Sequence, residues 1–67
     1  MTVAKIIELI GSSPNSWEEA TKNAITEAAK TVKGIKSAHV ERLTVKVDKN
    51  KIVEYRAVVR VAFVVQR

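Results

Sequence analysis

Few side chains in this sequence could carry chemistry, and they stand singly among apolar neighbours. Ser37 has no identified base that would activate it, so it is not interpreted as a nucleophile. The single histidine, His39, lies in an alternating run, and it is interpreted as a surface or interface residue because a catalytic role would need partners that the sequence does not identify. The sequence contains no nucleophile–base pair, metal-ligand cluster or phosphate-binding loop, so we do not expect an enzyme.

Charged residues offer two further kinds of chemistry. Arg56 and Arg60 fall on one face of a predicted strand, where they would form either an ion-pair network between subunits or an anion site for a phosphate-bearing ligand. Glu41 and Asp48 would bind a divalent cation only where symmetry brings several copies together. The ion-pair network is the simpler interpretation of the two arginines.

Length and composition limit how such residues can be held in place. The 67 residues are expected to form one domain, residues 1–67, and a chain of this size has a marginal core of its own. Disulfides and thiolate metal sites are excluded because there is no cysteine, and a single histidine disfavours a histidine-based zinc site. Oligomerisation is therefore the expected source of additional stability.

The net charge is +5, from 12 basic and 7 acidic residues spread through the chain, which favours a small anionic ligand weakly. Nucleic acid is not expected, because Trp17, Tyr55 and Phe63 occupy core-type positions and leave no exposed aromatic next to Arg56 for stacking. We find no apolar run of the roughly 18 residues that a membrane span needs, and no signal peptide, so a cytoplasmic location without membrane contact is expected.

One helix is predicted within residues 11–35. Ser16 and Glu19 have the spacing of a capping box at its start, and Gly34 is a candidate for its end. One face of the helix carries an apolar stripe with mostly small members, namely Trp17, Ala20, Ala24, Ala28, Thr31 or Val32, and Ile35. Small residues allow close approach, so we expect strands to pack closely around this helix.

Strands are predicted at residues 3–10, 37–47 and 52–66, which gives the order β-α-β-β of an α+β fold. The second strand changes phase, and a bulge near Glu41 and Arg42 would reconcile its two halves. Residues 48–51 form a polar turn typical of a hairpin. In the third strand, one face is continuously apolar and is expected to pack on the helix: Val53, Tyr55, Ala57, Val59, Val61, Phe63 and Val65. The opposite face keeps Val58, Ala62 and Val64, which we expect to meet another subunit.

These segments resemble a known family. Residues 5–20, KIIELIGSSPNSWEEA, are similar to the opening signature of the dodecins, as are residues 30–32 at the end of the helix. Residues 55–63, YRAVVRVAF, resemble the closing strand of that family. The resemblance covers nearly the whole chain in order. It implies a three-stranded antiparallel sheet that partly wraps one helix, and a hollow spherical homododecamer.

The resemblance also implies a flavin ligand, riboflavin or FMN. Dodecins stack flavins in pairs between tryptophans at the start of the second strand, and a glutamine of the third strand hydrogen-bonds the flavin ring. Matching the motifs places Ser37 at the tryptophan position and Arg56 at the glutamine position, so both cofactor-binding positions have changed. We therefore expect a ligand-binding or storage shell with weakened flavin binding. The alternatives are a flavin-free shell that binds a phosphorylated cofactor or ions, and a purely structural oligomer.

Overall fold

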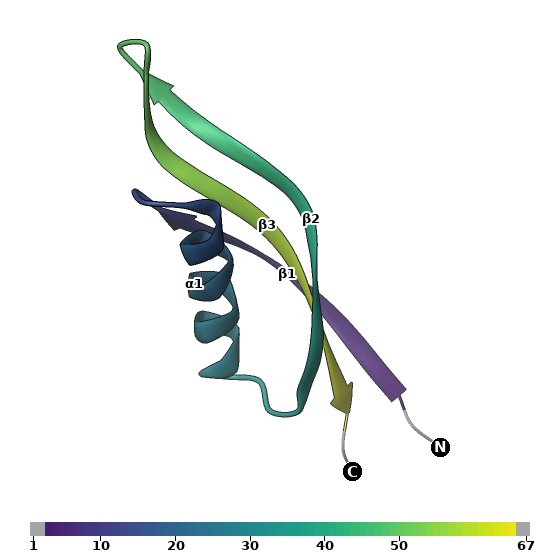
Figure 1. Cartoon of the computed structure of the whole chain (residues 1–67). Helices are drawn as coiled ribbons and strands as arrows, with labels where there is room; N and C mark the ends of the chain where they lie inside the picture. The colour runs from purple at the N-terminus through teal and green to yellow at the C-terminus, as the bar shows by residue number, and fades with distance from the viewer. Residues whose placement is uncertain (1–2, 66–67) are drawn as a thin grey trace.

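A computed structural model describes residues 3–65 and shows one sheet with one helix on one of its faces (Figure 1). The elements are β1 (Val3–Ser13), α1 (Trp17–Ala29), β2 (Ile35–Asp48) and β3 (Lys51–Val65). All pairing is antiparallel, and the strand order β1-β3-β2 places the last strand in the centre. The predicted α+β class and the β-α-β-β order are confirmed.

The core lies between α1 and the middle of β3, and every buried apolar side chain in it is small. Ala20, Ala24 and Ala28 of the helix pack against Ala57, Val59 and Val61 of the strand. The predicted stripe and the predicted helix-facing side of the third strand are therefore confirmed at their centres. Since alanine has the shortest apolar side chain, the helix lies very close to the sheet.

Gly11 of β1 makes this close approach feasible. A Cβ atom at this position would lie 2.0 Å from the carbonyl oxygen of Ala20 and 2.9 Å from the Cβ of Ala24. Both neighbours belong to α1, and one of them is backbone that cannot rotate away. The helix backbone therefore rests directly on the glycine.

The first turn of α1 is capped much as predicted, with one difference. The backbone N–H of Glu19 donates to the Ser16 hydroxyl at 3.0 Å. The Glu19 carboxylate does not return to the Ser16 backbone: it accepts hydrogen bonds from the Ser13 hydroxyl at 2.6 Å and from the Asn15 amide at 3.0 Å. The buried Ser13 hydroxyl is thus the donor to Glu19 in place of the Ser16 N–H, and it accepts hydrogen bonds from the N–H groups of Asn15 at 3.0 Å and Ser16 at 3.4 Å.

Two predicted boundaries were wrong. The first strand does not stop at Ile10, because β3 is long enough to pair Gly11, Ser12 and Ser13 with Ala57, Arg56 and Tyr55. The helix does not run to Gly34 but ends at Ala29, with Lys30 as its C-cap. Gly34 lies in the following loop at a φ of 79°, a conformation that glycine adopts without strain.

The phase change in β2 is a register shift between Val40 and Arg42, which confirms the predicted bulge. The shift returns Leu43 and Val45 to the same face as Val40, opposite β3 residues that point toward the helix side. The hairpin turn holds Lys49 and Asn50 at positive φ, as a two-residue turn of the primed type requires. The hairpin also extends well past the start of α1, so much of β2 is not covered by the helix (Figure 1).

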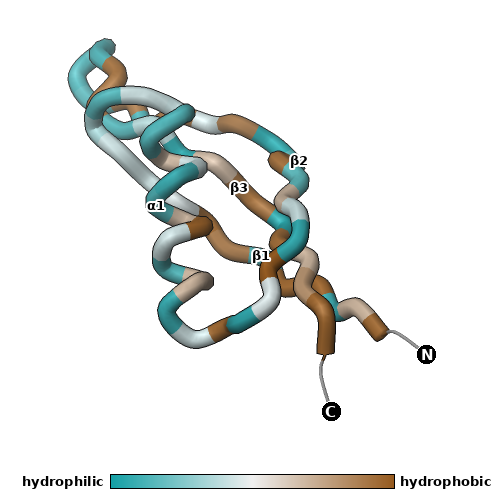
Figure 2. Tube along the Cα trace, turned by 60° about the horizontal axis from the view of Figure 1, so that its bottom comes forward, coloured by the Kyte–Doolittle hydropathy of each residue, from teal (hydrophilic) through white to brown (hydrophobic). Residues whose placement is uncertain are grey.

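The predicted third strand agrees with β3 over residues 52–65, and Gln66 lies outside the described residues. Apolar residues concentrate along β3 and at the end of the sheet where both termini lie (Figure 2). This end extends beyond the last turn of the helix.

We expect Gly11→Ala to lower the free energy of unfolding by about 1–3 kcal/mol, because the added methyl group forces the helix off the sheet. The control is Ser12→Ala, an exposed neighbour in the same strand, which should change stability by less than about 0.5 kcal/mol. Urea unfolding at one fixed protein concentration measures both. Equal stability of the two variants would show that the helix can shift freely at this contact.

We expect Glu19→Gln to destabilise the protein at neutral pH and to do so less in acid. The hydrogen bonds from Ser13 and Asn15, with a smaller contribution from Lys22, hold the pKa of Glu19 below its usual 4.5. Because the folded-state pKa is the lower one, this stabilisation is complete above about pH 4.5 and is lost as the pH falls through the folded-state value. Thermal unfolding at pH values from 7 down to 3 measures the difference in melting temperature between the variant and the unmodified protein. We expect this difference to shrink as the pH falls. Glu18→Gln, in the same turn, is the control, and a difference that stays constant with pH would contradict this account.

Candidate functional site

The candidate binding residues, Ser37 and Arg56, lie on the sheet face opposite the helix, which we call the open face. Alternation places these residues there, since Ala57, Val59 and Val61 point toward the helix. By register the open face comprises Ile6, Glu8, Ile10 and Ser12 of β1, Ser37, His39, Arg42 and Thr44 of β2, and Glu54, Arg56, Val58, Arg60, Ala62 and Val64 of β3.

Ser37 stands in an apolar part of the open face. Its partner in β3 is Ala62, which in turn pairs with Ile6 of β1. The Ile6 side chain is 66% exposed. A register shift between Ile35 and Ser37 lies directly beside this position. The row thus offers a planar ligand an apolar surface without an aromatic ring.

Arg56 stands in a polar row, between Ser12 of β1 and Thr44 of β2. Its guanidinium donates from Nε to the Glu54 carboxylate at 2.5 Å. Both side chains are partly exposed, so the pair remains accessible to solvent. One edge of the guanidinium is therefore already occupied by a neighbour on the same strand.

The structure does not bring Ser37 and Arg56 together within one protomer. Ser37 is level with Ala62, which is six positions along β3 from Arg56. At the usual rise of a strand this is about 20 Å. A single ligand that contacts both positions would have to take them from different copies of the chain.

A row of charged side chains separates the two positions. Arg60 donates from Nε to Glu8 at 3.1 Å, and its Nε lies 3.5 Å from a carboxylate oxygen of Glu41. His39 approaches that same carboxylate at 3.6 Å. These ion pairs form within one protomer, whereas the prediction was of a network between subunits. His39 is a surface residue, its side chain 73% exposed.

These pairings decide what the charged residues can do. Arg56 and Arg60 each contact a carboxylate, so neither presents an unneutralised anion site within residues 3–65. Glu41 and Asp48 are not brought together, because Glu41 lies in the bulge and Asp48 at the hairpin turn. Among the described residues no three metal-ligating side chains gather as a cation would need.

The aromatic residues differ from the prediction that all three are core residues. Trp17 is 39% exposed, and Tyr55 and Phe63 are half-buried. The Trp17 indole donates from Nε1 to the Thr44 backbone oxygen at 2.9 Å and meets the Tyr55 ring edge-on at 5.2 Å. The indole therefore joins the start of α1 to β2 behind the Arg56 row. One feature of the sequence could have indicated this contact, because a buried or half-buried tryptophan usually finds a hydrogen-bond acceptor for its indole N–H.

No helix in the described part of the chain is long and apolar enough to cross a membrane.

Comparison with known proteins gives a consistent result. A family model for dodecins matches residues 3–66. The calcium dodecin of Mycobacterium tuberculosis is 38% identical over 63 residues, covering 94% of this chain and 89% of that protein. Its crystal structure, described as that of a calcium-chelating antigen with a novel calcium-binding site, superposes with a TM-score of 0.85 at 36% identity, covering 96% of this chain and 91% of that one.

A mutant of the T. thermophilus dodecin superposes with a TM-score of 0.95 at 27% identity, and each chain is covered completely. The dodecin from Streptomyces coelicolor superposes with a TM-score of 0.94 at 18% identity, covering 98% of this chain and 94% of that one, a likeness of fold alone.

Proposed function

This chain belongs to the dodecin family, and we propose that it is a ligand-binding protein that assembles into a homododecamer and binds flavin weakly. The observation that carries this proposal is the pair of changed positions on the open face. Ser37 provides no ring, and Arg56 is held by Glu54. The fold of the family is kept while the two flavin-contacting side chains are not.

The apolar surface of the protomer supports the proposed assembly. The largest fully buried apolar side chains are Val59 and Val61, which form a small core for a chain of this length. Large apolar side chains are exposed on both faces of the sheet: Val3, Ile6, Ile10, Val40, Leu43, Val45, Val47, Ile52 and Val53. Surfaces of this kind mark contacts with other chains. Copies of the chain would cover them and supply the burial that one protomer lacks.

The chemistry of Ser37 and Arg56 explains why flavin binding should be weak. A flavin ring gains by stacking on another aromatic surface, and each such base–aromatic contact is worth about 1–3 kcal/mol in nucleic-acid complexes. A serine hydroxyl gives almost no stacking surface. The ring edge presents both donors and acceptors, which glutamine can complement, whereas arginine only donates.

Calcium is the second candidate ligand, because the relative at 38% identity is named a calcium dodecin. Within one protomer the carboxylates do not fit such a site. Glu8 and Glu41 converge on Arg60, whose positive charge takes the place of a cation between them. A calcium site would have to combine carboxylates from several copies. The paired arginines similarly reduce the support for a phosphorylated cofactor.

We expect sedimentation at micromolar concentration to give a particle with twelve times the 7.4 kDa mass of the chain. Ile10→Lys should lower this mass, because it places a charge on the open face at a side chain that is 68% exposed in the protomer. Thr26→Lys, which adds the same charge to the exposed surface of α1, should leave the mass unchanged. A stable folded monomer of the unmodified chain would overturn the proposed assembly.

We expect Ser37→Trp combined with Arg56→Gln to bind riboflavin more tightly than the unmodified protein, by about tenfold or more per restored ring contact. Quenching of riboflavin fluorescence measures the affinity. Ser37→Leu with Arg56→Gln is the control, because it restores apolar bulk without a ring. Tight quenching by the unmodified chain would show that another group holds the flavin, and no gain in the tryptophan variant would show that the pocket has a different shape.

A further inference from the structure

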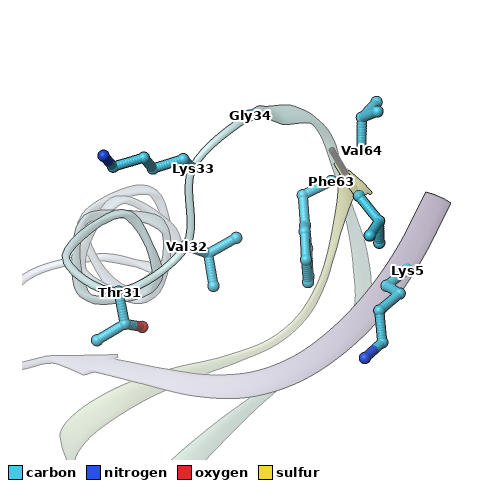
Figure 3. Close-up of a pocket in the computed structure, with 8 residues that line it drawn as sticks. Lys5, Thr31, Val32, Lys33, Gly34, Phe63 and Val64 are labelled. Atoms are coloured by element: carbon cyan, nitrogen blue, oxygen red, sulfur yellow. The ribbon is translucent and has the colours of Figure 1, made fainter. Parts of the chain in front are cut away.

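A pocket of about 510 Å³ (Figure 3) lies near the end of α1, at the end of the molecule away from the hairpin turn (Figure 1). It occupies the space between the loop that follows α1 and the last residues of β3. It is lined by Lys5, Thr31, Val32, Lys33, Gly34, Phe63, Val64 and Val65. This volume is within the range of pockets that bind small molecules. Lys5 and Phe63 in the lining are on the helix side of the sheet, opposite Ser37 and Arg56, whereas Val64 belongs to the open face.

The walls of the pocket are held by hydrogen bonds. The Val32 N–H continues the helix pattern to the Ala28 oxygen at 2.9 Å. The Val64 N–H donates to the Gly34 oxygen at 3.3 Å and so ties the loop to β3. The positive φ of Gly34 turns the chain between these two attachments. The pocket is thus bounded by a fixed loop.

Its interior is apolar. The Val32 side chain extends toward Phe63 across the space between helix and sheet (Figure 3). Phe63 continues the helix-facing side of β3 beyond Val61, at a level that the helix no longer covers, and is half-buried. Contact between this exposed part of the aromatic ring and another apolar group would remove apolar area from water, which is energetically favourable.

The polar side chains of the lining are the neutral Thr31 and two cationic lysines, Lys5 and Lys33. Lys5 is the direct register partner of Phe63 in β1, so its side chain stands beside the ring on the same face. Lys33 is also in the lining, but its side chain points away from Phe63 (Figure 3). Within residues 3–65 neither amine forms an ion pair with a carboxylate.

We propose that this pocket binds a small anion with an apolar tail, such as a medium-chain carboxylate. The tail lies between Val32 and Phe63, and the carboxylate pairs with the Lys5 ammonium. An apolar wall with one adjacent cation complements this kind of ligand better than a neutral or a cationic one. The site does not depend on the flavin position, so each can fail without the other.

The test compares octanoate with 1-octanol, which has the same tail without the charge. Titrations monitored by NMR of the valine methyl groups in the full-length assembled protein give both affinities. We expect octanoate to bind about two- to fivefold more tightly than octanol, as an exposed ion pair allows. Lys5→Gln should remove this preference. Lys33→Gln, which changes the net charge equally at the same rim, should keep it.

Val32→Gln tests the apolar half of the site independently. The substitution should lower the affinities for octanoate and for octanol several-fold. The thermal unfolding curve should be unchanged, since Val32 lies in the loop and outside the buried core. The methyl signals of Val32 and Val65 should shift during the titration. Three results would each overturn the proposal. The first is that methyl signals shift on the open face instead, and the second is that the two lysine variants have equal effects. The third is that octanoate does not bind at millimolar concentration because a second copy fills the pocket.

Discussion

The close approach of α1 to the sheet at Gly11 is the contact on which the other features depend. Because the helix backbone rests on a glycine, the side chains between the two layers must be small, and they are alanines and valines. Such a core removes little apolar area from water, and the stabilisation that it provides scales with that area. The larger apolar residues are displaced to the outer parts of the sheet. A protomer built in this way has its principal apolar surfaces on the outside, where only other chains can cover them.

The parts of the structure that could be predicted are those that depend on residues close together in the sequence. The cap at Ser16, the bulge beside Glu41 and the alternation of β3 each follow from a few consecutive residues, and all three are present. The extension of β1 through Ser13 was missed because it depends on the length of a strand more than forty residues away. The Trp17–Thr44 hydrogen bond depends in the same way on register.

The candidate site shows the same division. Sequence patterns placed Arg56 on the face of the third strand that does not pack on the helix, and the register of the sheet puts Ser37 on that same face. They did not predict that Glu8 and Glu41 share Arg60, because these contacts need strand partners that a linear pattern does not identify. The Glu54–Arg56 pair, two residues apart on one strand, was also not predicted. The open face is consequently less basic at its centre than the net charge of the chain suggests. An anion approaching it would have to displace a carboxylate that already lies within hydrogen-bonding distance.

Two of the three register shifts between β2 and β3 place an extra residue in β2, which has a consequence for self-association. With the order β1-β3-β2, this strand pairs on one side only within the described residues, and its outer backbone groups form a sheet edge. A long regular edge is a template on which further strands can add without limit, as in amyloid. Irregularities at Ile35/Ser37 and Val40/Arg42, each with one extra residue in β2, interrupt that template in the first half of the strand. A strand from another chain cannot stay in phase across them, so the edge opposes fibrillar growth while leaving the side-chain faces available for a closed particle.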